Sequence, residues 1–129
     1  MIKYLGIDYG LAHIGLATSQ HTLATPLPSL HNDSTVFLRL TSIVREQGIT
    51  HIVCGIPEGT LAPKVIKFAE ELESFAGLKV VLTPETLSSQ EAKHKLHEAR
   101  ASLAKKKNDH AYAACLILED YLELNNVVY

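Results

Sequence analysis

The 129-residue sequence predicts an α/β protein with a mixed five-stranded sheet, three antiparallel strands and then two parallel ones, flanked by helices. Its first third alternates apolar and polar residues between closely spaced glycines and prolines, as in strands joined by short turns. Farther along, short β-branched runs alternate with segments whose apolar residues recur every three or four positions, as in helices that connect parallel strands. The length suits a single domain, which we expect to span residues 1–129.

Residues 4–19, YLGIDYGLAHIGLATS, predict a strand, a glycine-marked turn and a second strand. Alternation places Asp8 on the same face of the first strand as Gly6. An ionised carboxylate in an otherwise apolar strand is costly unless something pairs with it. Asp8 is therefore either a turn carboxylate satisfied by amides or solvent, or a metal ligand or catalytic acid. In the second case, Gly10 and Gly15 would let a ligand or another backbone approach closely.

The third strand and the first helix follow. We expect the strand over residues 24–30, at an edge of the sheet, because Pro26 and Pro28 each remove a hydrogen-bond donor. The next segment has apolar residues at helical spacing, with Asp33 or Ser34 as its cap.

Two glycines, Gly48 and Gly77, predict the C-terminal ends of the first and second helices. Between them, residues 50–55 predict a buried strand, and Pro63 suits the first turn of the second helix. Residues 78–83 predict another buried strand. Because a helix separates these two apolar strands, we expect them to be parallel neighbours.

Two more helices complete the predicted order β-β-β-α-β-α-β-α-α. Ser88 and Glu91 have the spacing of a capping box, and the third helix extends to Leu103. Asn108 can cap the last helix, whose broad apolar face reaches Leu122.

Composition and charge narrow the class of function. The net charge of −2 argues against a protein that coats nucleic acid by bulk attraction. No apolar run is long enough to cross a membrane and no secretory signal is recognisable, so we expect a cytoplasmic protein with no membrane partner. Cys54 and Cys115 lie in apolar runs and are expected to be buried.

A local basic patch is present despite the negative net charge. It consists of Lys93, His94, Lys95, His97 and Arg100, followed by Lys105, Lys106 and Lys107. Such a run is either a solvated helix face with a charged loop, or a surface that contacts phosphate groups.

Three carboxylates do not lie on solvated helix faces: Asp8 in the first strand, Glu85 just after the last strand, and Asp109 in the first turn of the last helix. Ligands gather beyond the carboxyl ends of parallel strands, and a helix N-terminus favours a carboxylate. If the central strands align as predicted, the three meet at one edge. Three oxygen donors with no His or Cys at ligand spacing suit Mg²⁺ or Mn²⁺, the ions of two-metal phosphodiester cleavage.

Four blocks of sequence resemble, in this order, the YqgF/RuvX family: LGIDYG with IGLATS in residues 5–19, IVCGIP at 52–57, ETLSSQEA at 85–92 and KKKNDHAYAACLILEDYL at 105–122. The resemblance implies an RNase H-like fold. It also implies a nuclease that resolves Holliday junctions or processes the 5′ end of pre-16S rRNA. The family's acidic residues fall on Asp8, Glu85 and Asp109, the three that spacing had singled out.

The sequence departs from the family's pattern at four places, two of which are Gln20, where an Asp is common, and the short loop after Gly55. Where the family usually reads Asp-Glu-Arg-Leu-Thr, the segment around Glu85 is Pro-Glu-Thr-Leu-Ser, so an acid and a phosphate-binding arginine are missing. The first turn has Leu11, Ala12 and His13 in place of basic residues. These departures predict weakened activity, with phosphate contacts moved to Lys64, His13 or the lysine run at 105–107.

Other functions fit less well or stay open. ATPases of the actin and sugar-kinase superfamily close two such domains around a nucleotide, and this chain has the length of one. A dinucleotide-binding domain lacks the required glycine spacing. A non-catalytic nucleic-acid-binding module that kept the fold stays open. For a nuclease, we favour an RNA precursor over branched DNA and expect a monomer or weak dimer, because the apolar helix stripes are needed to cover the sheet.

Overall fold

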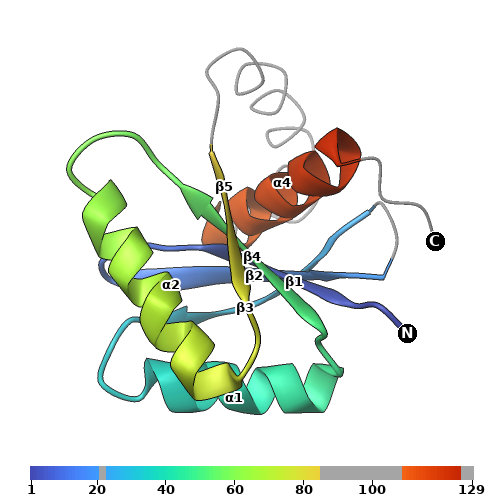
Figure 1. Ribbon diagram of the computed structural model, residues 1–129, viewed down its shortest axis with the longest axis horizontal. Coiled ribbons are helices and arrows are strands. Elements are labelled where there is room, and N and C mark those ends of the chain that lie inside the picture. The colour runs from blue at the N-terminus through green and yellow to red at the C-terminus, as the bar shows by residue number, and fades with distance from the viewer. Residues whose placement is uncertain (21–22, 85–108, 126–129) are drawn as a thin grey trace.

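The computed structural model describes residues 1–20, 23–84 and 109–125, the last range without the side chains of 109 and 110. Five strands form one sheet in the order β3-β2-β1-β4-β5 (Figure 1). They are β1 (Tyr4–Asp8), β2 (His13–Ser19), β3 (Thr25–His31), β4 (His51–Ile56) and β5 (Val80–Pro84). The helices in this part of the chain are α1 (Val36–Gln47), α2 (Ala62–Ala76) and α4 (Asp109–Leu124). Among the described helices, none combines the length and apolarity that a membrane span requires.

The pairing confirms the predicted mixed sheet. β1, β2 and β3 form an antiparallel meander, whereas β1 pairs with β4 and β4 with β5 in parallel. The proline-containing β3 is an edge strand, as expected. β4 and β5 begin one and two residues later than predicted and both end one residue later, at the pair Ile56 and Pro84. β5 is an edge strand with only Val80 and Thr83 buried, so the prediction of a buried strand there was wrong. The predicted third helix lies outside the described residues, and the single-domain boundary stays a prediction.

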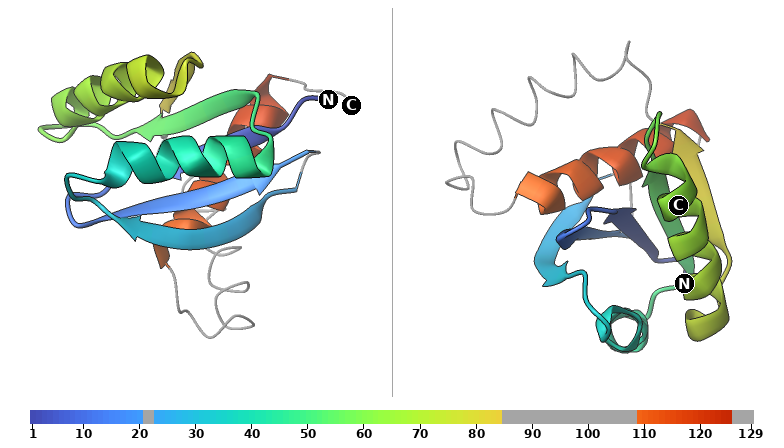
Figure 2. Two further views of the ribbon diagram at one scale, coloured as in Figure 1. Left: turned by 90° about the horizontal axis from the view of Figure 1, so that it is seen from below. Right: turned by 90° about the vertical axis from the view of Figure 1, so that its left-hand side faces the viewer.

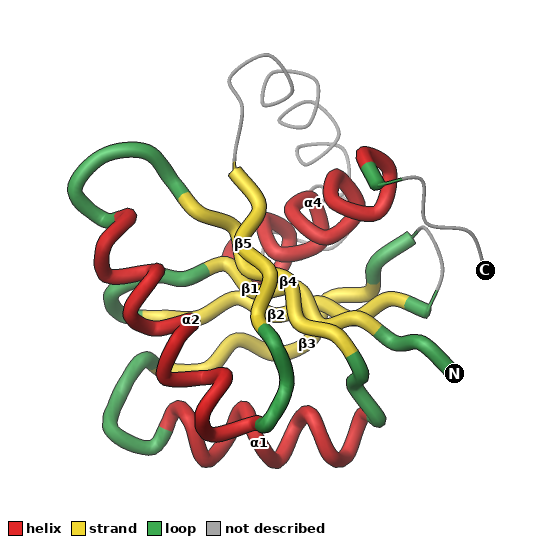
Figure 3. The backbone as a smooth tube through the Cα atoms, viewed as in Figure 1, coloured by secondary structure: helices red, strands yellow, loops and turns green. Residues whose placement is uncertain are grey.

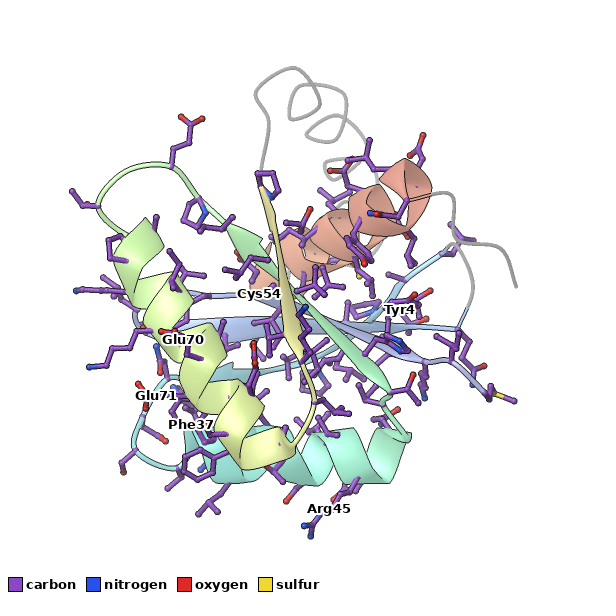
Figure 4. All side chains as sticks on the ribbon, viewed as in Figure 1. Tyr4, Phe37, Arg45, Cys54, Glu70 and Glu71 are labelled. Carbon is purple, nitrogen blue, oxygen red and sulfur yellow. The ribbon has the colours of Figure 1, made fainter. Side chains whose placement is uncertain are left out.

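Helices cover both faces of the sheet (Figure 2). Leu5 and Ile7 of β1 point into a core shared with α1 and α2, and Tyr4 points into a second core beneath α4. The two buried cysteines divide in the same way, with Cys54 in the first core (Figure 4) and Cys115 in the second. The alternation of the strand residues therefore produces two apolar layers, one on each side of a central sheet.

The helix ends were predicted well at their C-termini and less well at one N-terminus. Gly48 and Gly77 end α1 and α2 in the left-handed conformation, with φ of 67° and 72°. The prediction of Asp33 or Ser34 as the cap of α1 was wrong, because Thr35 occupies that position without a side-chain cap. Asp33 instead closes a local turn, since its carboxylate accepts hydrogen bonds from the hydroxyl and the amide of Thr35. These hydrogen bonds hold the pKa of Asp33 below its ordinary value.

Candidate active site

The candidate site lies at the edge of the sheet where the parallel strands β1, β4 and β5 end, at Asp8, Ile56 and Pro84. We call this the carboxyl edge. Because β2 is antiparallel to β1, its first residue, His13, belongs to the same edge. Edges of this kind bind ligands in open α/β sheets, because the loops that follow the strands converge there.

Asp8 is held at the end of the central strand. β1 pairs with β2 on one side and β4 on the other, and Asp8 is opposite Gly15 in the register with β2. Its side chain is half-buried. The ladder with β2 includes Asp8 and the ladder with β4 ends one residue before it, at Ile7, so the fold restrains the backbone from which the carboxylate projects.

The face on which Asp8 lies is the one that α4 covers. The ring of Tyr4 lies 6.2 Å from that of Tyr121, and a Cβ on Gly6 would lie 2.8 Å from the Cβ of Leu118 and 3.0 Å from the carbonyl oxygen of Ala114. As β1 advances toward Asp8, its contacts therefore move toward the N-terminus of α4, so the helix and the strand run in opposite directions (Figure 3).

Asp8 follows Gly6 on this face, two residues nearer the carboxyl edge. α4 begins at Asp109. The N-terminus of a helix carries a partial positive charge that stabilises carboxylates nearby. That Asp8 and Asp109 meet stays a prediction from the sequence.

The remaining predicted site residues have the following places. Lys64 is exposed in the first turn of α2, which follows β4 from the carboxyl edge. Glu85 comes directly after Pro84, the last residue of β5, and lies outside the described residues. Also outside them are Lys93, Arg100, Lys105, Lys106 and Lys107.

A hard divalent ion suits the oxygen donors that the sequence predicts for this edge. Asp8 ends β1, and Asp109 begins α4. Within residues 1–20, 23–84 and 111–125, no three His, Cys, Asp or Glu side chains gather closely enough to hold a metal. Glu85 and the side chain of Asp109 lie outside the described part of the chain, so the metal site formed with Asp8 stays a prediction.

Two glycines that position α4 were missed by the sequence analysis. Gly6 lies under Ala114 and Leu118, and a Cβ on Gly55 would lie 2.6 Å from the Cδ1 of Ile117. The sequence instead predicted that a ligand or another backbone comes close to the chain at Gly10 and Gly15. The sequence signal that could have predicted where α4 packs closely is a glycine inside an apolar strand, on the face opposite the bulky residues.

The turn between β1 and β2 is tied to the end of β3. The side-chain amide of Asn32 donates to the carbonyl of Gly10 at 2.9 Å, and its backbone N–H donates to the carbonyl of Ala12, also at 2.9 Å. On the other face of the sheet, Tyr9 packs against Phe68 with ring centroids 4.9 Å apart. The segment after Asp8 is therefore braced from two directions.

Together, the strand order, the carboxylate at the end of the central strand and the helix that crosses it define an RNase H-like protein. Solved structures share this fold: RuvC of Thermus thermophilus in complex with a Holliday junction has a TM-score of 0.70, with 14% identity over 98% of this chain and 96% of RuvC. The Holliday junction resolvase of fowlpox virus has a TM-score of 0.60, with 12% identity over 96% of this chain and 99% of the viral one.

The chain belongs to the RuvX family, whose model, described as Holliday junction resolvase, matches residues 2–124. A relative from Thermoanaerobacter pseudethanolicus is 34% identical over 134 residues, covering 95% of this chain and 96% of its own. One from Sulfurihydrogenibium is 31% identical over 133 residues, covering 95% and 91%. Both relatives are named pre-16S rRNA nuclease. The family resemblance seen in the sequence is thus confirmed, and the two names indicate two different substrates.

Proposed function

We propose that this protein is a divalent-metal-dependent nuclease that cleaves RNA at the carboxyl edge, in the 5′-end processing of a 16S rRNA precursor. The observation that carries the proposal is the position of Asp8, a half-buried carboxylate at the end of the central strand, on the face of the sheet that α4 covers. Relatives 31–34% identical over nearly the whole chain and named for this activity support the choice of substrate.

The proposed catalytic residues are Asp8, Glu85 and Asp109. Mg²⁺ or Mn²⁺, when bound, would supply a water nucleophile at neutral pH and stabilise charge on the leaving oxygen. The task of the protein is to hold the ligand carboxylates in place. The pairing of Asp8 with Gly15 of β2 restrains its backbone, and the N-terminal end of α4 favours the ionised form of carboxylates near it. In the proposed site the charges are arranged before the substrate arrives, which is the main source of electrostatic catalysis.

We favour RNA over a four-way DNA junction as the substrate because helices of the chain itself cover the sheet. Symmetric junction cleavage requires two active sites held by a stable two-fold dimer. In the part of the chain that the structure describes, α1 and α2 bury one face of the sheet and α4 buries the other. Trimming RNA requires one acidic site beside a basic surface. Junction resolution is the second candidate, favoured by the description of the family model and the fold shared with RuvC.

The substrate can be tested directly. Purified protein with Mg²⁺ or Mn²⁺ is incubated separately with an rRNA-precursor fragment and a mobile four-way junction, while its mass in solution is measured. We expect faster cleavage of the RNA by a monomer or weak dimer. The Asp8→Asn variant, purified in the same way, controls for contaminating nucleases. A stable dimer that nicks the junction symmetrically and ignores the RNA would favour the second candidate. Cleavage of neither would favour the non-catalytic module.

The basic residues are proposed to bind the phosphate backbone: Lys64, Lys93, Arg100, Lys105, Lys106 and Lys107. Replacing Lys105, Lys106 and Lys107 together by alanine should weaken RNA binding and flatten its salt dependence. Each lost phosphate contact removes about 0.7 from the log–log slope on a single strand and about 0.9 on a duplex. The measurement is affinity at several salt concentrations without divalent ions.

A matched control is Lys79→Ala, which removes an exposed lysine just before β5, at the opposite edge of the sheet. This variant should keep the wild-type slope. Equal slopes for the wild type and the triple variant would show that the lysine run is only solvated.

A further inference from the structure

The turn between β1 and β2 presents an apolar side chain at the carboxyl edge. Leu11 is 62% exposed, although leucine is usually buried. Asn32 donates two hydrogen bonds, to the carbonyls of Gly10 and Ala12, the residues on either side of Leu11. The structure therefore fixes the backbone on both sides of Leu11, three residues after Asp8.

Two histidines extend this surface across the neighbouring strands. His13 begins β2 and His31 ends β3, and they are direct partners in the antiparallel register. Their rings lie 4.8 Å apart, tilted by 44°, and both residues are exposed. Asn32, which braces the turn, directly follows His31 in the sequence. We call Leu11, His13 and His31 the turn surface.

The chemistry of the turn surface suits nucleobases better than phosphates. None of its three residues is a lysine or an arginine, the residues that dominate phosphate contacts, and the charge of nearby Arg39 acts on the Asp33 carboxylate. The carboxylate next along the chain, Asp33, is engaged by Thr35. Aromatic rings, including imidazole, stack on unstacked bases of single-stranded RNA, and stacking requires no net charge. In a duplex, the faces of the bases are already stacked on one another and are not accessible.

We propose that the turn surface receives unpaired bases of the RNA strand whose backbone reaches Asp8, so that the protein selects single-stranded segments. This inference rests on the proposed function, because it places the same substrate at the same edge. The inference also distinguishes contacts with the RNA backbone from contacts with its bases. The lysine run would supply salt-sensitive attraction for the backbone, and the turn surface would supply salt-insensitive contacts with bases.

The test measures binding without divalent ions, so that metal-dependent cleavage cannot interfere. Fluorescence anisotropy compares a labelled, unstructured RNA with the same strand in a duplex, at several salt concentrations. The variants are His13→Ala with His31→Ala, His13→Phe with His31→Phe, and Leu11→Ser. The control is His51→Ala, an exposed histidine at the start of β4, on the opposite edge. Thermal denaturation verifies that each variant is folded.

We expect the double alanine variant to bind the single strand at least about fivefold more weakly, with an unchanged salt slope and little effect on the duplex. Leu11→Ser should weaken binding in the same direction, and the phenylalanine pair should retain it because the rings remain. A salt slope that falls by about 0.7 for each histidine removed would overturn the inference, since it would show phosphate contacts. Unchanged affinity of the folded alanine variant, or binding of the wild type to duplex alone, would also overturn it.

These results distinguish the inference from the proposed function. If the wild type cleaves RNA and the alanine variant binds it normally, the inference fails and the nuclease stands. If the wild type binds single strands through the turn surface and cleaves no RNA with Mg²⁺ or Mn²⁺, the base-binding surface stands and the nuclease fails.

Discussion

Replacing Asp8 by asparagine is expected to abolish RNA cleavage while leaving the protein folded. Asparagine has nearly the same shape, so the pairing of β1 with β2 and β4 should persist. What is lost is the charge that would bind a divalent ion at the end of the central strand. Removing one preorganised electrostatic group typically reduces kcat by about 10²–10³-fold, and a metal ligand should matter at least as much.

Stability provides a second measurement for the same variant. One carboxylate fewer in a cluster of three relieves like-charge repulsion, so without metal the Tm should stay level or rise. Mn²⁺ should raise the Tm of the wild type, because a ligand that binds the native state stabilises it, and this rise should be lost in the variant. Glu46→Gln, an exposed acid near the end of α1, close to the opposite edge where β4 begins, is the matched control and should behave as the wild type. A variant that unfolds several degrees earlier and cleaves normally would show that Asp8 is structural.

The second large effect is expected at Gly6, where alanine should destabilise the protein. In most strands, alanine in place of glycine is neutral or favourable, because glycine loses more conformational entropy on folding. At Gly6 a Cβ would lie 2.8 Å from the Cβ of Leu118 and 3.0 Å from the backbone oxygen of Ala114. Neither atom can rotate away, so α4 itself must shift. Overpacking of this kind costs about 1–3 kcal/mol, which is roughly a 4–11 °C lower Tm for a chain of this size.

Gly55→Ala is the matched comparison for Gly6→Ala. Its nearest contact, at 2.6 Å, is the Cδ1 of Ile117, the end of a side chain that can change rotamer. Alanine should therefore be tolerated better here, and adding Ile117→Val, which removes Cδ1, should restore part of any loss. Leu118→Ala should not rescue Gly6→Ala, because the clashing Cβ and the backbone oxygen of Ala114 both remain. Equal Tm values for Gly6→Ala and the wild type would show that α4 does not pack closely on Gly6.

The Gly6→Ala variant also tests whether α4 positions the active site. A shift of α4 would move Asp109 relative to Asp8, because Asp109 begins the helix that packs on Gly6 of β1. We therefore expect cleavage to fall more in Gly6→Ala than in Gly55→Ala when both are assayed well below their Tm. If cleavage is unaffected while the Tm falls, the position of α4 does not determine activity.

Most of the local structure could be predicted from the sequence, because it depends on neighbouring residues. Alternation revealed β1 and β2, and the helical spacing of apolar residues revealed α1 and α2. Gly48 and Gly77 marked helix ends because few other residues adopt a positive φ readily. Asp8 stood out as a carboxylate in an apolar strand, and the family could be recognised from four ordered blocks.

Only the tertiary structure decided how these elements meet. The order β3-β2-β1-β4-β5, which makes β1 central, depends on pairing between distant segments. Gly6 and Gly55 acquire their role only when Leu118 and Ile117, more than sixty residues away in the chain, pack on them. The bracing of Leu11 by Asn32 and the pairing of His13 with His31 likewise depend on the register of β2 with β3. Sequence patterns record which face of an element is apolar, but contacts between elements are selected by the packing of the whole chain, which no local pattern contains.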